Sequence, residues 1–445
     1  MRAEAREEGK AYEAFLRVAQ EGDALYLDLA NPAGNVIEIT ADGWRPIDRP
    51  PVRFIQGAGR ALPMPEKGGK VRDLRDFINI DANKERDLMI LVAWLVAAFR
   101  PGCSFPILVL TGEAGSAKTT TSKMLKSLVD PSQAMGRGLP KTEDDLLVSA
   151  RSNHVLAADN LSGMTAEMAD AICRVSTGGG IAKRKLYEDG TEYVIEAQRP
   201  VIIAAINTPT NRQDFLSRAL LVQLQPIPEG SEKRKLEKRL WKDFEHAHPK
   251  LLGALLDGVV MGLRNADALE KEVKIYPRMA DFALFAAAAM PAWGWKSESF
   301  LECYAEMREG LVADAGQSDA VLAAIVEWLR SIKPEVIQGN EVRRFQGTTT
   351  ELLSILNMFK LNDVEDKNWR QENRWPAAAN QLSRRLRTGA SGLRAMGVGF
   401  EEAGSTRLKL IQLWSGPVKP AFESKPLSKE HLELLLQETR NQGPI

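Results

Sequence analysis

One stretch of the chain has the residue types and spacing of a phosphate-binding loop that leads into a helix. The residues of this loop pattern are Gly112, Glu113, Ala114, Gly115, Ser116, Ala117, Lys118, Thr119 and Thr120. Backbone N–H groups of such a loop wrap a chain of phosphates, and the N-terminus of the helix adds partial positive charge. The lysine reaches the β- and γ-phosphates, and the first threonine is a ligand of Mg²⁺. We therefore expect this stretch to bind ATP and Mg²⁺.

The position before the lysine, which is usually glycine, is Ala117. A methyl group fits there only if the backbone keeps a negative φ, and we expect that conformation. The apolar run before the loop and the amphipathic stretch after it predict a strand and a helix. That context is the one in which the loop pattern is meaningful.

An ATPase with such a loop also needs an acid at the end of a neighbouring strand, near the Mg²⁺. An apolar run ends in Asp159, so we expect Thr119 and Asp159 to form the metal site. The next residue is Asn160, where a glutamate would orient the attacking water. Asparagine holds a water but cannot take its proton, so hydrolysis is slow unless another acid, such as Glu113 or Asp170, serves. The sequence does not decide between these.

Two further polar residues fit roles at the γ-phosphate. Asn207 follows the apolar run of residues 200–206, so it is expected to bind the γ-phosphate or the attacking water. Arg218 precedes the next apolar run, where an arginine can neutralise charge on the γ-phosphate of a neighbouring subunit. Arg212 is the rival candidate. A strand-end turn and a surface ion pair are the structural alternatives for Asn207 and Arg218.

Between Asp159 and Asn207 lies a basic segment with Lys183, Arg184 and Lys185. It follows the glycines of residues 178–180, and residues 188–190 predict the turn of a hairpin. A basic hairpin can track a nucleic-acid backbone through phosphate contacts. The acidic turn weighs against that role, and a solvated charged face fits equally well.

The elements that position these residues form an alternating pattern, with helical stretches between most of the expected strands. The strands are Ile107–Leu110, His154–Ala158, Val201–Ile206 and Leu220–Leu224, with a short run near Gln133–Leu139 as a possible fifth. Unbroken apolar runs bracketed by helices predict a parallel sheet covered on both faces, so the fold class is α/β.

Residues 1–85 are expected to form a small accessory region. A charged helix over residues 1–15 leads into a hairpin of Leu25–Asp28 and Val36–Thr40, and residues 57–69 form a Gly- and Pro-rich linker. The apolar helix Leu88–Phe99 is too short to span a membrane.

After the ATPase core of residues 86–229, we expect a helical subdomain over 230–335 and a winged-helix-like domain over 336–415. A linker and a helix, Ser428–Thr439, complete residues 416–445. The winged-helix prediction rests on helices followed by a two-stranded ribbon: Thr348–Leu356, Ala377–Leu386, Thr388–Met396, then Val398–Phe400 and Leu408–Leu413.

The C-terminal domain carries a cluster of arginines on its expected helices: Arg384, Arg385, Arg387 and Arg394, with Arg407 and Lys409 on the ribbon. Such a cluster supplies DNA affinity through phosphate contacts without a basic chain overall. A winged helix that binds only protein is the alternative.

The bulk composition sets the remaining limits. The chain has 445 residues, enough for two to four domains, and 59 basic against 59 acidic residues, so nucleic-acid contacts must come from local patches. Its three cysteines, Cys103, Cys173 and Cys303, have no metal-ligand spacing. With no signal peptide visible, we expect a cytoplasmic protein with no membrane contact.

In combination, the loop, Asp159, the basic hairpin, Asn207 and Arg218 resemble the superfamily 3 branch of P-loop AAA+ helicases. The stretches GEAGSAKT, HVLAADNLSGM, DAICRVSTGGGIAKRKLY, RPVIIAAIN and DFLSRALLVQL are more similar still to ATPases of phage and integrated mobile elements, often fused or adjacent to primases. The resemblance covers residues 85–300. It implies a hexameric ring that moves along DNA and hydrolyses ATP between subunits, with a primase as partner.

The expected function is therefore an ATP-dependent DNA helicase in replication of a mobile element. Two alternatives stay open. An AAA+ ATPase that remodels proteins needs an aromatic pore loop, for which Tyr187 is the nearby candidate. A DNA-binding initiator that uses ATP as an assembly switch would fit the slow hydrolysis that Asn160 suggests.

Overall fold

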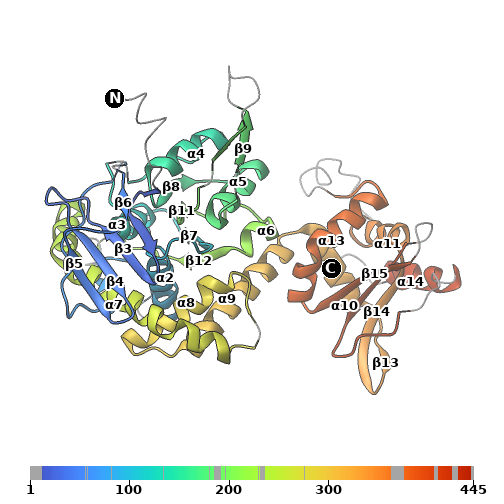
Figure 1. Ribbon diagram of the computed structural model, residues 1–445. Helices are drawn as coiled ribbons and strands as arrows, with labels where there is room; N and C mark the ends of the chain where they lie inside the picture. Colours follow the sequence, from blue (N-terminus) through green and yellow to red (C-terminus); the bar gives the residue numbers. More distant parts are fainter. Residues whose placement is uncertain are drawn as a thin grey trace. The chain divides into compact units, whose positions relative to one another are not determined.

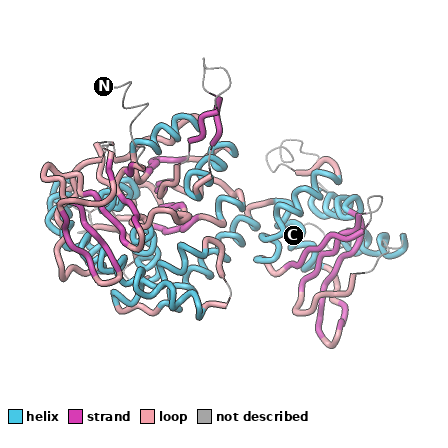
Figure 2. The backbone as a smooth tube through the Cα atoms, in the orientation of Figure 1, coloured by secondary structure: helices cyan, strands magenta, loops and turns pink. Residues whose placement is uncertain are grey.

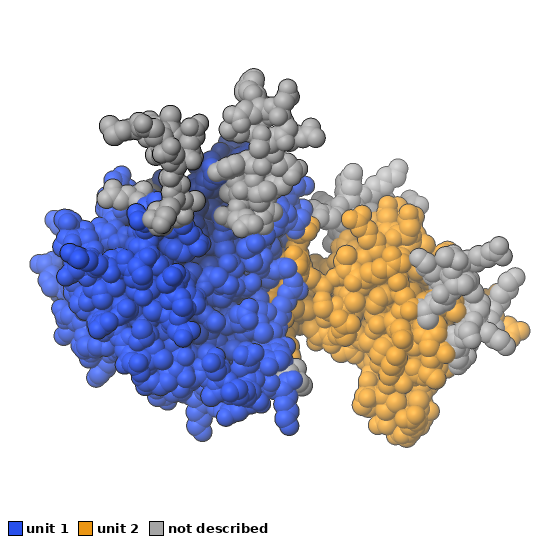
Figure 3. Space-filling view, in the orientation of Figure 1, with its two compact units in different colours: residues 1–210, 218–307 blue, residues 211–217, 308–445 orange. Residues whose placement is uncertain are grey.

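The computed structural model describes residues 13–55, 57, 59–81, 83–133, 135–179, 181–184, 192–195, 197–228, 230, 236–274, 276–361, 375–404, 409–422 and 429–441. The chain forms two compact units, which Figure 3 shows in different colours. The first comprises residues 1–210 and 218–307, and the second comprises residues 211–217 and 308–445.

The centre of the first unit is a parallel sheet of four strands: β7 (Ile107–Thr111), β8 (Leu156–Leu161), β11 (Val201–Ala205) and β12 (Ala219–Gln223). Their order is β12-β7-β11-β8, and every residue of β7 and β11 is buried. The predicted parallel sheet is therefore confirmed. The possible fifth strand is reduced to one parallel bridge between Arg137 and Ala158 beside β8.

Helices alternate with the first strands of this sheet along the chain, as predicted (Figure 1). They are α2 (Glu85–Ala97), α3 (Lys118–Val129), α4 (Glu143–Ser152) and α5 (Ala166–Thr177). α3 packs on β8 and β11, and α2, which is buried along most of its length, packs on β12. None of the described helices is long and apolar enough to cross a membrane.

The expected basic hairpin is present as two antiparallel strands, β9 (Ile181–Arg184) and β10 (Glu192–Ile195). Its turn lies outside the described residues, and with it the DNA-contact candidate Lys185 and the pore-loop candidate Tyr187.

The N-terminal region folds into an antiparallel sheet in chain order: β2 (Val18–Glu21), β3 (Ala24–Asp28), β4 (Val36–Thr40) and β5 (Gly43–Ile47). The predicted hairpin is β3–β4. The helix predicted over residues 1–15 is wrong at its end, because β1 (Ala14–Phe15) pairs in parallel with β6 (Arg53–Phe54). Residues 1–12 lie outside the described range. The N-terminal sheet belongs to the first unit, since Trp44 donates to Asp257 of α7 at 2.8 Å.

The helical stretch after the core is confirmed as α7 (Glu237–Glu272), α8 (Ala280–Ala289) and α9 (Ser297–Gln317), with a short 3₁₀ turn η2 (Met290–Trp293) between α8 and α9. Another 3₁₀ turn, η1 (Val71–Asp76), precedes α2. The expected linker of residues 57–69 packs closely on α7. A Cβ at Gly253 would lie 1.8 Å from the carbonyl oxygen of Glu66, so only glycine fits there. The linker is thereby fixed to the body of the first unit.

The second unit is built on an antiparallel sheet with the order β13-β14-β16-β15, and helices pack against it (Figure 2). Its elements are α6 (Gln213–Leu216), α10 (Ala320–Ser331), β13 (Glu335–Ile337), β14 (Asn340–Thr348), α11 (Thr349–Leu361), α13 (Ala379–Ala395), β15 (Val398–Gly404), β16 (Lys409–Ser415) and α14 (Lys429–Asn441).

Three predictions for this unit need correction. β13 and β14 extend the expected two-stranded ribbon to four strands. The two helices predicted on either side of residue 387 are the single helix α13, because the Thr388 hydroxyl bonds back to the carbonyl of Arg384 at 3.1 Å and does not break the helix. The unit also starts before residue 336, since α10 buries Trp328 and its neighbours in the same core.

Candidate active site

The predicted phosphate-binding loop lies between β7 and α3, at the carboxyl edge of the parallel sheet. Gly112 has a φ of 149°, and a Cβ there would lie 2.8 Å from both the Leu224 carbonyl oxygen and the Ser116 hydroxyl. Gly115 has a φ of 80°. Both glycines of the pattern are therefore required by the backbone, as in a loop that folds tightly around a ligand.

Ala117 has φ 63° and ψ 28°, so the expectation of a negative φ at this position is wrong. The left-handed conformation costs a residue with a Cβ roughly 1–2 kcal/mol. Ala117 is also the N-cap of α3, and no side chain caps this end. The first-turn amides of Lys118, Thr119 and Thr120 thus have no partner within the helix, and their positive ends suit an anion.

The Lys118 ammonium lies inside the loop. Its Nζ donates to the carbonyl oxygens of Gly112 and Glu113 at 2.8 and 2.7 Å. Burial lowers the pKa of Lys118, and the carboxylate of Asp159 opposes that effect. The lysine is therefore held at the loop by bonds to carbonyl groups that a phosphate oxygen can replace.

The predicted metal ligands are in contact. Thr119 Oγ1 donates to Asp159 Oδ1 at 3.0 Å, although the two residues come from α3 and β8. Asp159 lies within β8 instead of after it, because the strand starts at Leu156 and not at His154. A hydroxyl and a carboxylate are oxygen ligands of the kind that Mg²⁺ prefers, so this pair fits that ion.

Asn160 occupies a bulge in β8. The register between β8 and β11 shifts at this point, and Asn160 has a φ of 58°. Its backbone N–H donates to Asp159 Oδ1 at 2.9 Å, which fixes the carboxylate. Asparagine tolerates a left-handed backbone better than glutamate does, which gives a conformational reason for this residue type. Of the alternative acids, Glu113 is exposed in the loop and Asp170 lies on α5.

Asn207 lies at the carboxyl ends of the strands of the sheet, and Arg218 lies at their amino ends. The Gly112 N–H donates to the carbonyl of Ile206 at 3.3 Å, so the exposed Asn207 follows directly beside the loop. The Ile107 N–H donates to the Arg218 carbonyl at 2.9 Å, which puts Arg218 at the start of β7. The length of β7, about 15 Å at the usual rise per residue, separates it from Gly112. The rival Arg212 belongs to the second unit.

Sequence reasoning missed Asn79, which precedes α2. Its side-chain amide donates to the carbonyls of Ser116 in the loop (3.4 Å) and of Gln225 after β12 (2.5 Å). Asn79 thus ties the loop to the neighbouring strand. No local pattern marks it, because both partners are far away in the sequence.

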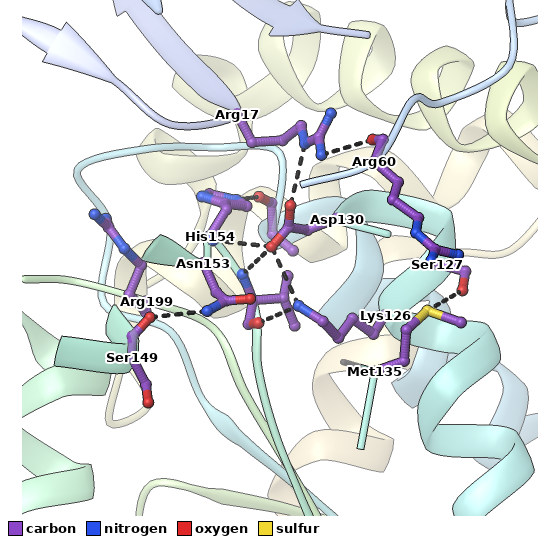
Figure 4. A network of polar contacts seen from close by, with 12 residues as sticks. Arg17, Arg60, Lys126, Ser127, Asp130, Met135, Ser149, Asn153, His154 and Arg199 are labelled. Carbon is purple, nitrogen blue, oxygen red and sulfur yellow. Dashed lines mark hydrogen bonds and ion pairs between the residues drawn. The ribbon is translucent and has the colours of Figure 1, made fainter. Parts of the chain in front are cut away.

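A second missed feature is a buried polar network at the other end of α3 (Figure 4). Asp130 Oδ2 accepts from Lys126 Nζ (3.2 Å) and from the backbone N–H groups of His154 (2.9 Å) and Val155 (3.0 Å). Its Oδ1 accepts from Arg17 Nε at 3.1 Å. The network joins the end of α3 to the start of β8, so the two elements that carry Thr119 and Asp159 are tied at both ends.

This network fixes the ionisation of its members. Burial alone would raise the pKa of Asp130, but the charges of Lys126 and Arg17 hold it below the ordinary value. Burial lowers the pKa of His154 to about 4, although Asp130 opposes the shift. The carboxylate is therefore ionised and the imidazole neutral at neutral pH.

The predicted DNA-contact arginines of α13 divide into two kinds. Arg385 is paired with Asp319 at 2.8 Å and Arg387 with Glu402 at 2.7 Å. Arg384 and Arg394 are exposed, and neither has an ion pair with a residue that the structure describes. For the other candidates, Lys183 and Arg184 lie on β9, where only the backbone is described, and Arg407 lies outside the described range.

Comparisons with solved structures give distant likenesses. The C-terminal region of NrS-1 has 10% identity and a TM-score of 0.36, covering 87% of this chain and 95% of that one. A full-length MCM homologue from Methanopyrus kandleri has 15% identity and a TM-score of 0.33, covering 66% and 74%. The JCV helicase has 12% identity and a TM-score of 0.25, covering 51% and 71%. These TM-scores are too low to carry an argument about this chain.

No curated protein matches the sequence. Two family models do. Residues 72–311, more than half of the chain, match the replication protein of actinomycete integrative conjugative elements, and residues 321–421 match the C-terminal domain of the same RepA family. The chain therefore belongs to the family of replication proteins of actinomycete integrative conjugative elements, which confirms the mobile-element part of the resemblance.

Proposed function

We propose that this replication protein is a P-loop AAA+ ATPase of the superfamily 3 type that moves along DNA as a helicase. The observation that carries the proposal is the 3.0 Å contact between Thr119 and Asp159 beside a loop that holds Lys118. A phosphate-binding loop, its threonine and an acid on another parallel strand of the same sheet are the parts that a P-loop ATPase needs; here the acid is on β8, which β11 separates from β7.

In this proposal the chain's own groups bind and orient ATP. The first-turn amides of α3 and the Lys118 ammonium bind the phosphates, and Asn207 contacts the γ-phosphate or the attacking water. The oxygens of Thr119 and Asp159 would hold Mg²⁺, which supplies charge neutralisation at the β- and γ-phosphates when bound. Asp159 is already oriented for this by the Asn160 N–H.

In this mechanism Arg218 acts on ATP that is bound to a neighbouring subunit. It lies at the amino end of β7, whereas the loop lies at the carboxyl end, so it cannot reach the γ-phosphate of its own loop without a large movement. An arginine in this position acts by entering the site of another subunit. The proposed assembly is therefore a ring, for which a hexamer is the expected number.

The second unit is proposed as the DNA-binding winged helix. Its order of helix α10, strand β14, helices α11 and α13, and strands β15 and β16 is that of a winged helix, with α13 as the recognition helix. The exposed Arg384 and Arg394 supply phosphate contacts. A primase is the proposed partner during replication.

The test is ATP turnover by the full-length protein with and without single-stranded DNA. A helicase motor should turn over ATP faster when DNA is added, and Lys118→Ala should abolish nucleotide binding. Lys123→Ala, on the same helix, is the matched control and should bind ATP. A wild-type protein that binds no ATP, or binds it equally well without Lys118, would refute the proposal.

One observation favours a second function. Asn160 cannot accept a proton from water, and its left-handed backbone disfavours a glutamate there. An initiator that binds DNA and uses ATP as an assembly switch fits this site. ATP-dependent assembly on DNA with turnover that does not respond to DNA would favour the initiator over the motor. An ATPase that remodels proteins has no such support among the described residues.

A further inference from the structure

The short helix α6 (Gln213–Leu216) belongs to a different compact unit from the residues on either side of it. Residues 211–217 group with the second unit, whereas Thr210 and Arg218 group with the first. Phe215 and Leu216 are 1% and 2% exposed, so packing holds the helix in place. A piece of the second unit is thus inserted in the chain directly before Arg218.

The partner of α6 within its unit is α13. The hydroxyl of Ser391 donates to the side-chain carbonyl oxygen of Gln213. The helices approach closely here, because a Cβ at Gly392 would lie 3.0 Å from Gln213 Nε2 and 3.3 Å from the Gly316 Cα. Any residue other than glycine would press on α6.

Ser391 lies on the face of α13 that is proposed to meet DNA. Arg384, Arg387, Ser391 and Arg394 are separated by three, four and three residues, which puts them on one side of the helix. We call these four residues the α13 stripe. The leucines of α13 at 382, 386 and 393 are buried on the other side. DNA that lies along the stripe therefore meets Ser391, the residue that bonds Gln213.

One residue separates the C-terminal end of α6 from Arg218. That residue, Ser217, continues the helical hydrogen bonding: its N–H donates to the Gln213 carbonyl at 2.9 Å and its hydroxyl to the Asp214 carbonyl at 2.8 Å. The carbonyl of Arg218 is bonded to the Ile107 N–H of β7. Arg218 is therefore joined to α6 by hydrogen-bonded backbone, with no loop between them.

We propose that α6 couples DNA on the α13 stripe to Arg218, with Gln213 and Ser391 as the positioning residues. DNA that contacts the stripe competes for the Ser391 hydroxyl, shifts α6 and changes where Arg218 points. The proposal rests on the proposed function, in which Arg218 completes the ATP site of a neighbouring subunit. It assigns α6 a regulatory role in the DNA response of the ATPase.

The test is Gln213→Ala in the full-length protein, with ATP turnover measured with and without a single-stranded oligonucleotide. Because this variant removes the bond that DNA is proposed to break, turnover without DNA should rise towards the DNA-stimulated rate of wild type. Oligonucleotide affinity should stay within about twofold of wild type, and the ratio of stimulated to basal turnover should fall at least about fivefold. The change in turnover should lie in kcat and leave the KM for ATP unchanged, because Arg218 acts on the reacting phosphate. A merely structural role would lower thermal stability and leave the ratio of stimulated to basal turnover intact.

Two serine variants on α13 test whether the coupling passes through Ser391. Ser391→Ala should lose the DNA response as Gln213→Ala does, and the double variant should lose no more than either single one. Ser383→Ala removes a hydroxyl from the same helix that bonds Glu402 at 3.2 Å, and it should keep the full response.

The outcomes separate this inference from the proposed function. Full stimulation of Gln213→Ala, or additive losses in the double variant, overturns the coupling and leaves the ATPase assignment standing. A wild-type protein that hydrolyses ATP without any response to DNA also overturns it. If wild type and Lys118→Ala bind no nucleotide, the proposed function itself fails.

Discussion

Lys126 and Asp130 form a buried ion pair at the end of α3, with 3.2 Å between Nζ and Oδ2, and both side chains are under 5% exposed. The same oxygen of Asp130 accepts the N–H of Val155, which precedes β8. At the opposite ends of the same two elements, Thr119 donates to Asp159. The separation and alignment of the candidate metal ligands therefore depend on a carboxylate remote from the site.

Asp130→Asn should lower the free energy of unfolding by about 3–5 kcal/mol, because it leaves the buried cations of Arg17 and Lys126 without a full counter-charge. Chemical denaturation of the full-length protein measures the loss. The matched control is Glu38→Gln, which removes the partner of Arg45, a side chain that is 73% exposed. That change should cost less than about 1 kcal/mol. Equal losses in the two variants would contradict the assigned role of Asp130.

Ala117→Gly should leave the protein as stable as wild type or stabilise it by up to about 1 kcal/mol, because glycine has no penalty at positive φ but has more freedom when unfolded. Ala305→Gly is the control, since Ala305 is exposed within α9 and the same change there should cost about 1 kcal/mol. Thermal unfolding compares the two. A destabilisation of Ala117→Gly as large as that of the control would show that Ala117 is not left-handed.

The parts of the fold that could be predicted are those with a strong local pattern. β7 and β11 are unbroken apolar runs, and the loop between β7 and α3 has a characteristic spacing. Parallel pairing then brings the carboxyl ends of β7 and β11 to one edge, so Asn207 beside Gly112 follows from topology. The contact between Thr119 and Asp159 follows for the same reason.

The parts that could not be predicted depend on distant partners or on backbone conformation. β5 and β13 are short strands with half-buried or exposed residues, and Arg45 in β5 and Glu335 in β13 leave no long apolar run. Asn79 and Asp130 bond to groups far along the chain, which no local spacing reveals. The positive φ of Ala117 runs against the preference of its residue type, so only the structure shows it.

Arg218→Ala should retain ATP binding and lose hydrolysis, if Arg218 completes the site of a neighbour. Mixing it with Lys118→Ala, which is inactive for a different reason, should restore part of the turnover, because some interfaces then pair an intact loop with an intact arginine. The measurement is ATP hydrolysis across a series of mixing ratios. Mixtures that stay inactive, under conditions where the subunits exchange, would show that Arg218 acts within its own subunit.

The two kinds of arginine on α13 should behave differently towards DNA. Arg384→Ala and Arg394→Ala should each weaken DNA binding and reduce the slope of log affinity against log salt by about 1, as expected for one lost phosphate contact. Arg385→Ala should lower stability and leave that slope unchanged, because Arg385 is paired with Asp319 at the start of α10. Binding isotherms over a range of salt concentrations test both. A lower slope for Arg385→Ala alone would reverse the assignment.

Two buried histidines should make the protein less stable as the pH falls from 6.5 to 4. Burial lowers the pKa of His248 to about 4, and that of His154 is lowered to about 4 as well, from an ordinary value of 6.5. Within this window the unfolded chain binds protons that the folded protein does not, so each histidine removes roughly 3 kcal/mol across it. Above pH 6.5 neither contributes to the pH dependence.

The His248→Leu variant isolates one of these contributions. The loss of stability between about pH 7 and about pH 5 should shrink by about 2 kcal/mol relative to wild type, because one of the two titrations is removed. Phe244→Leu is the control: Phe244 lies against His248 with ring centroids 5.3 Å apart, so its loss should lower stability equally at both pH values. Denaturant unfolding at the two pH values gives the comparison. An unchanged pH dependence in His248→Leu would mean that His248 is accessible to protons in the folded protein, through an opening of the packing around α7.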